Sequence, residues 1–168
     1  CSRDWSSDVC SSDLKIALRL YSFWLLLFIQ FRRYTELTRK RMKLTKNFNL
    51  SEFECKGNLE GCYCRLSDDV YRNIKELAEN LQIVRDELQE PIKINSAYRC
   101  EAWNGLNNGT LKSQHLQGKA ADIVVKNFTP DEVANAIDKL QQGGFIKCGG
   151  LGRYDTFTHI DIRGSEAR

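Results

Sequence analysis

Histidine, proline and methionine are scarce in this chain of 168 residues, which contains two, two and one of them. Any chemistry that needs an imidazole must therefore use His115 or His159. No glycine-rich phosphate loop and no basic stretch interleaved with aromatic residues is present, which argues against nucleotide and nucleic-acid binding. Internal repeats and low-complexity tracts are also missing, so repeat architectures are excluded.

The chain does not begin with methionine, and its one methionine is Met42. Residues 4–14, DWSSDVCSSDL, match in order the translation of a sequencing-library adapter, so we interpret residues 1–14 as adapter translation. Residues 15–34 are apolar but are broken by Arg19, and the run is shorter than the roughly 20 apolar residues of a membrane-spanning helix. We interpret residues 15–41 as an untranslated leader, with a signal anchor as the alternative, and residues 42–168 as one domain.

Charge divides the chain at the same place. Residues 1–41 hold eight Lys/Arg and four Asp/Glu, a net +4, whereas residues 42–168 hold seventeen and eighteen, a net −1; together these give the +3 of the whole chain. The basic character therefore belongs to the leader and does not indicate a nucleic-acid partner.

Two helices are predicted with clear ends. Ser67 is a good N-cap for a helix of about twenty residues that ends before Pro91. Its apolar residues recur at spacings of three and four: Val70, Ile74, Leu77, Leu81, Val84 and Leu88. The second helix follows Thr129, with Pro130 at its first position, Glu132 completing a capping box and Gly143 at its end.

Strands are predicted at residues 92–99 and 119–125, the latter apolar enough to be central. Two further short strands, in 145–154 and 157–163, are joined by a turn at Asp155 and Thr156. Helices and strands do not follow a strict βαβ order, so the predicted class is α+β, a small antiparallel sheet flanked by helices.

A carboxylate stands where the pattern predicts a buried strand: Asp122 lies within the apolar run 120–125. Burial of an unpaired carboxylate costs several kcal/mol, so Asp122 needs a partner or a cation. With His115 and His159 it would form a three-ligand zinc site that leaves a fourth position open, the pattern of catalytic zinc. The alternative is that Asp122 caps a turn or pairs with Arg99 and the histidines are unrelated.

The segments SQHLQGKAADI (113–123) and THID (158–161) resemble the family of zinc D-Ala-D-Ala carboxypeptidases and L-alanyl-D-glutamate peptidases. INSAYRCEAWN (94–104) and GGLGRY (149–154) extend the similarity to about residues 47–164. These are bacterial and phage cell-wall peptidases that share the hedgehog fold. The resemblance implies one Zn²⁺ bound by His115, Asp122 and His159. It also implies peptidoglycan peptides as substrate, with Arg99 on a substrate carboxylate and Ser113 and Gln114 as further contacts.

The general base departs from the family pattern. Relatives carry an acid three positions before the last zinc histidine or a second histidine two before it, and here these positions are Thr156 and Phe157. The available acids are Asp155 and Asp161, and we favour Asp161 because on a strand it shares a face with His159. A chain without a competent base would instead be a zinc-stabilised module that binds wall peptides or a protein partner.

The cysteines and the leader bear on the cellular compartment in which the protein is made and acts. Without the adapter the chain keeps an odd number, Cys55, Cys62, Cys64, Cys100 and Cys148, which we interpret mainly as free thiols, with a disulfide or a second metal site among the first three as alternatives. We expect synthesis in the cytoplasm and release to the cell wall, as for phage lysins, or else a periplasmic or membrane-anchored enzyme. A monomer is expected, without membrane contact unless residues 15–34 are real.

Overall fold

The structure is a computed structural model that describes residues 20–21, 23–31, 42–57, 66–147 and 149–165. It divides into two compact units, Cys1–Lys40 and Arg41–Arg168. Residues 20–21 and 23–31 are helical, and no helix in the described ranges is long and apolar enough to cross a membrane. The adapter at 1–14, most of the leader, and Cys62, Cys64 and Cys148 lie outside the described residues, so the interpretation of residues 1–41 stays a prediction.

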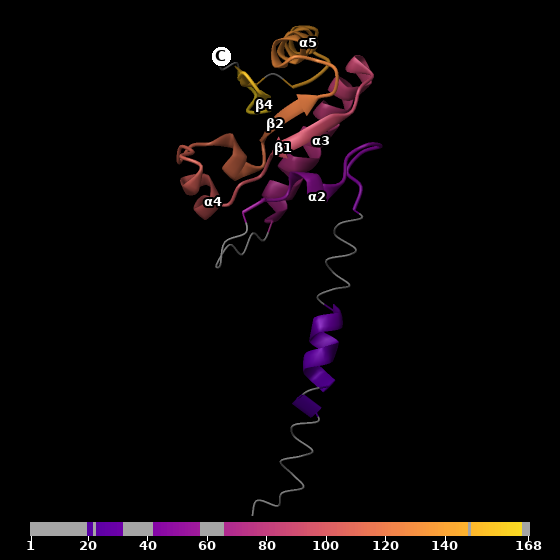
Figure 1. Cartoon of the computed structure of the whole chain (residues 1–168), viewed down its shortest axis with the longest axis vertical. Coiled ribbons are helices and arrows are strands. Elements are labelled where there is room, and N and C mark those ends of the chain that lie inside the picture. The colour runs from indigo at the N-terminus through magenta and orange to yellow at the C-terminus, as the bar shows by residue number, and fades with distance from the viewer. Residues whose placement is uncertain (1–19, 22, 32–41, 58–65, 148, 166–168) are drawn as a thin grey trace, which may run out of the picture. The chain divides into compact units, whose positions relative to one another are not determined.

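The second unit is built on a four-stranded sheet in the order β1-β2-β4-β3 (Figure 1). The strands are β1 (Ile92–Ser96), β2 (Ala120–Val125), β3 (Leu151–Arg153) and β4 (Thr158–Asp161). Every neighbouring pair is antiparallel and β2 is an inner strand, which confirms the predicted class. Each observed strand is shorter than the predicted segment, and the β3–β4 connection contains the predicted turn at Asp155 and Thr156.

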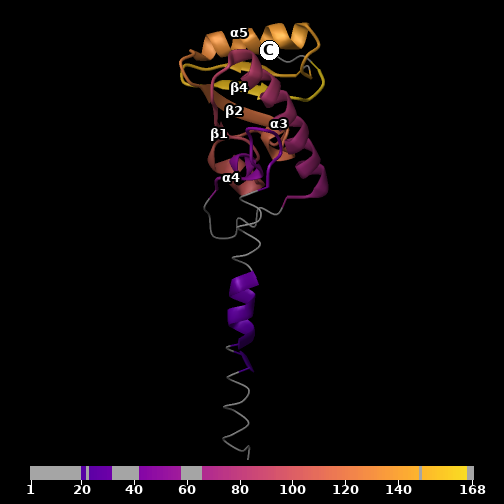
Figure 2. The same cartoon turned by 90° about the vertical axis from the view of Figure 1, so that its right-hand side faces the viewer.

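The two long helices begin at the predicted caps. Helix α3 spans Asp68–Leu88, and the Ser67 side chain accepts a hydrogen bond from the amide of Val70. Helix α5 spans Pro130–Gln142 and begins with a complete capping box between Thr129 and Glu132. Figure 2 shows α3 and α5 running in different directions beside the sheet. The short elements are α2 (Leu50–Phe53), α4 (Glu101–Leu106) and the 3-10 helix η1 (Gln114–Gln117).

One face of the sheet belongs to the hydrophobic core. Ile94, Ile123 and Ile160 from three strands cluster with the buried stripes of α3 and α5. The stripe of α3 consists of Ile74, Leu77, Leu81 and Val84, and that of α5 of Val133, Ile137 and Leu140. Because successive side chains of a strand point to opposite faces, the neighbours of these isoleucines lie on the other face of the sheet. Asp122, His159 and Asp161 are among them.

Candidate metal centre

A row of residues crosses the sheet on the face away from the core. Ser96 of β1 is paired with Asp122 of β2, Asp122 with His159 of β4, and His159 with Gly152 of β3. An irregularity in β1 between Ile94 and Ser96 brings Ser96 into this register. The pairing therefore places two of the three predicted zinc ligands directly opposite each other.

His115 reaches the row from η1. Its ring is buried, and its Nδ1 lies 2.6 Å from the carbonyl oxygen of Ala97. A carbonyl can only accept a hydrogen bond, so Nδ1 donates to Ala97 and Nε2 is the nitrogen that remains to face Asp122. Nε2 lies 3.4 Å from Oδ1 of Asp122. The second nitrogen of His115 is therefore prepared as a metal ligand, in the way that outer hydrogen bonds orient metal-binding histidines.

The two oxygens of Asp122 face different partners. Oδ1 lies 2.8 Å from Nδ1 of His159, and Oδ2 accepts a hydrogen bond of 2.6 Å from Nη2 of Arg99. The Nε group of Arg99 donates to the hydroxyl of Ser96 at 2.8 Å. Burial alone would raise the pKa of Asp122, but hydrogen bonds from the two histidines outweigh it and hold the pKa well below its ordinary value. The ion pair with Arg99 and the contact with both histidines, treated as alternatives on the sequence, exist together.

His159 lies between two carboxylates. Burial lowers its pKa, but hydrogen bonds to Asp122 and Asp161 outweigh this and raise the pKa to about 9. While Nδ1 faces Asp122, Nε2 is 3.7 Å from Oδ2 of Asp161. Asp161 therefore stands behind the ring, on the side away from the other two ligands.

Asp161 is completely buried and strongly held. Its Oδ1 accepts hydrogen bonds from the amides of Gly150 (2.9 Å) and Arg163 (3.1 Å), and the Arg163 guanidinium binds both carboxylate oxygens. Burial raises the pKa of this carboxyl, but the hydrogen bonds from His159, Arg163 and Gly150 outweigh it and lower the pKa far below the ordinary value. Such a carboxylate is a weak proton acceptor, because an efficient general base has a pKa near the working pH.

The donor set fits zinc. The ligand atoms of His115, Asp122 and His159 all lie within 4.8 Å of one another. Zinc bonds of 2.0–2.2 Å in a tetrahedron separate ligand atoms by about 3.3 Å, so a small adjustment brings these three into range. Two nitrogens and one oxygen are the ligand types of catalytic zinc sites. Within the described ranges, no other group of three or more His, Cys, Asp or Glu is arranged in this way.

The remaining predicted residues lie near the row or at its edge. Ser113 and Gln114 are half-buried and directly precede His115 at the start of η1. Asp155 is exposed in the β3–β4 turn. Sequence reasoning missed two residues. Ser96 accepts a hydrogen bond from Arg99, and Arg163 binds the carboxylate of Asp161. Arg163 had a usable signal, since it stands two residues after Asp161 at the end of a strand; the role of Ser96 depends on the irregularity in β1, for which the sequence carries no signal.

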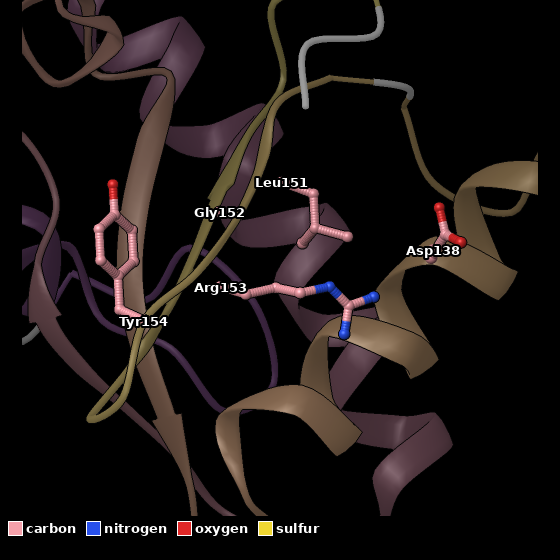
Figure 3. Close-up of a pocket in the computed structure, with 5 residues that line it drawn as sticks. All are labelled: Asp138, Leu151, Gly152, Arg153 and Tyr154. Atoms are coloured by element: carbon pink, nitrogen blue, oxygen red, sulfur yellow. The ribbon is translucent and has the colours of Figure 1, made fainter.

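An open pocket of about 590 Å³ lies at the edge of the sheet, lined by Asp138 of α5 and by residues 151–154. Figure 3 shows Leu151 and Arg153 on the side of β3 toward α5, whereas the Tyr154 side chain lies on the opposite side. Arg153 is anchored there by hydrogen bonds to Asp131 and Asn135 of α5. None of the three predicted zinc ligands lines this pocket.

Comparison with known proteins gives matches to a solved structure and to a protein family. A crystal structure of the L-Ala D-Glu endopeptidase ChiX from Serratia marcescens is 17% identical, with a TM-score of 0.41, over 63% of this chain and 95% of that chain. No curated protein matches this chain. The Peptidase M15 family matches residues 46–161, a span that contains every residue of the row and all three predicted ligands. The chain belongs to the Peptidase M15 family and is a zinc peptidase.

Proposed function

We propose that this chain hydrolyses peptide bonds in the stem or cross-link peptides of peptidoglycan, using one Zn²⁺ held by His115, Asp122 and His159. The observation that carries the proposal is the convergence of these three side chains, one of them with Nδ1 held by a backbone carbonyl so that Nε2 faces the other two. The substrate class rests on the resemblance of the motifs to cell-wall peptidases. A non-catalytic binding module is not favoured, because the family is one of peptidases.

Each ligand is held by a second residue. Ala97 fixes the ring of His115, Arg99 holds Oδ2 of Asp122 and leaves Oδ1 for the metal, and Asp161 stands behind His159. These outer contacts reduce the freedom that the ligands lose when the metal binds. When bound, zinc would polarise the scissile carbonyl and make a water molecule a nucleophile near neutral pH.

We propose that Asp161 positions His159. Its buried oxygens are already occupied by Gly150 and Arg163, and its lowered pKa makes it a poor base. This assignment modifies the sequence-based preference for Asp161 as the base. Asp155, in the exposed turn, is the other acid to test for proton transfer.

We propose that Arg99 also contacts a carboxylate of the substrate. Its Nε and Nη2 groups are used by Ser96 and Asp122, while Nη1 has no hydrogen-bond partner in the part of the chain that the structure describes. A planar guanidinium fixed on one edge presents its other donors in a defined direction. Ser113 and Gln114, next to His115, are proposed as further substrate contacts.

The test is digestion of purified peptidoglycan with the whole chain, with and without a zinc chelator, followed by mass spectrometry of the products. We expect new peptide termini that disappear with the chelator and are absent with His115→Ala, and their masses identify the bond. A folded, zinc-loaded protein that releases no peptides would contradict the proposal. Peptidoglycan as substrate means that the protein acts at the cell wall, and we propose that it reaches the wall by release from the cell, as a monomer.

A further inference from the structure

Two cysteines far apart in the sequence are in contact beside the metal centre. Sγ of Cys55 lies 3.7 Å from Sγ of Cys100, and the Cys100 amide donates to Sγ of Cys55 at 3.4 Å. We propose that Cys55 and Cys100 are a disulfide-forming site, oxidised when the protein is outside the cytoplasm. Both residues are half-buried, so a small oxidant can reach them.

The backbone around the pair is already held in place. The segment after α2 lies along the segment after β1, with the Tyr98 amide donating to the Phe53 carbonyl at 3.0 Å. Nζ of Lys56 donates to the carbonyls of Ile94 (2.6 Å) and Asn95 (2.9 Å). To form a disulfide the sulfurs must close from 3.7 Å to about 2.05 Å, and the hydrogen bonds on both sides of the pair hold the two segments next to each other.

Glycine at position 57 keeps the two segments close beyond the pair. A Cβ at Gly57 would lie 2.9 Å from Cβ of Trp103, in the first turns of α4. Cys100 is the N-cap of α4, and its sulfur accepts a hydrogen bond from the Trp103 amide at 3.4 Å. The disulfide would thus join the start of α4 to the chain that follows α2.

The site matters for function because Cys100 directly follows Arg99. Arg99 holds Oδ2 of Asp122 and, under the proposed function on which this step rests, contacts the substrate. Fixing Cys100 restricts the backbone of Arg99, so the disulfide acts as a positioning element for substrate binding. We expect reduction to raise KM several-fold with little change in kcat.

The oxidant that we propose for this reaction is a small-molecule disulfide such as oxidised glutathione. The two thiols lose two protons and two electrons to form the S–S bond, and the oxidant is reduced to two thiols through a mixed disulfide. Compartments outside the cytoplasm supply oxidants of this class, and peptidoglycan lies there.

Peptide mapping tests the pair directly. The whole chain is treated with oxidised glutathione, blocked with an alkylating agent and digested with trypsin without reduction. Cleavage after lysine and arginine places Cys55 in peptide 47–56 and Cys100 in peptide 100–112. The other cysteines fall in peptides 1–3, 4–15, 57–65 and 148–153, so each pair of linked peptides has its own mass.

We expect a disulfide-linked pair of peptides 47–56 and 100–112 that disappears on reduction. Absence of this pair, linkage of either peptide to peptide 57–65, or thiols that react only after a chelator is added would each overturn the proposal. This mapping does not depend on cleavage of peptidoglycan, so its outcome is separate from that of the proposed function.

Variants test the effect on the site. Cys100→Ser keeps an oxygen that can cap α4, and Cys55→Ser removes the other sulfur, with Cys148→Ser as the matched control. Reduction with a phosphine should raise KM in the unmodified chain and in Cys148→Ser, and should leave both pair variants unchanged at the raised KM. A KM that responds to reduction in Cys55→Ser would overturn the positioning role.

Discussion

The environment of Asp161 in the structure does not suit the role of a general base. Its carboxylate is buried, bound by Arg163 and Gly150, and directed at the nitrogen of His159 that faces away from Asp122. For Asp161→Asn we expect zinc affinity to fall about 10- to 100-fold, the usual effect of removing an outer-shell partner. Competition with a chromogenic chelator measures this affinity, and activity should recover largely at saturating zinc.

Asp155→Asn is the matched comparison, because it removes a carboxylate from the exposed turn and leaves Asp161 in place. Unchanged zinc affinity with lost cleavage in Asp161→Asn would return the base role to Asp161. The same result in Asp155→Asn would identify Asp155 as the base.

Gly152 permits the close approach of two side chains at the end of the row. A Cβ at this position would lie 2.9 Å from Cε2 of Tyr154 and 3.1 Å from Cβ of His159. Gly152→Ala should therefore displace Tyr154 or His159 and reduce kcat/KM by about 10- to 100-fold, because small displacements at a catalytic site are costly. Gly105→Ala, where the structure leaves open space, is the control and should keep full activity. Equal activity of both variants would contradict this account.

At the scale of elements, local signals identified the two long helices well. Ser67 and the Thr129–Glu132 box depend on residues three positions apart, so the caps were visible in the sequence. The strands were identified but drawn too long, since strand ends depend on pairing partners. The row Ser96–Asp122–His159–Gly152 could not be predicted, because it depends on register and on the irregularity in β1.

The capping box of α5 gives a pH dependence with a defined sign. Hydrogen bonds from the amide and hydroxyl of Thr129, both 2.8 Å, lower the pKa of Glu132 below its ordinary 4.5. A lowered carboxyl pKa adds stability above the unfolded value and loses it as the pH falls through the folded value. Glu132→Gln should therefore be less stable than the unmodified chain at pH 7, and the difference should shrink as the pH falls below 4.5.

Thermal unfolding between pH 7 and pH 3 measures this difference. Glu79→Gln, at an exposed position of α3, is the control and should follow the unmodified chain throughout. If the difference in thermal stability between Glu132→Gln and the unmodified chain stays constant with pH, the charge of Glu132 contributes nothing to stability.

For the second unit as a whole, the two faces of the sheet separate stability from chemistry. The core face packs against the buried side chains of α3 and α5, while the predicted ligands lie on the opposite face and on η1. Leu81 is completely buried on α3 and belongs to the hydrophobic core. Leu81→Ala should lower the free energy of unfolding by about 2–5 kcal/mol through lost burial and cavity formation, and should leave kcat/KM nearly unchanged while the protein is folded.

Removal of zinc should have the opposite effect to Leu81→Ala: activity should be lost while the fold is kept. Chelation should abolish cleavage while the circular dichroism of the helices and sheet stays near that of the loaded protein, because the core does not depend on the metal face. Parallel measurement of unfolding and turnover for Leu81→Ala and for the chelated protein checks both halves. If chelation unfolds the protein, the metal is part of what holds the two faces together, and the loss of cleavage then no longer identifies zinc as the catalyst. Retention of cleavage after complete chelation would exclude the metal from the reaction altogether.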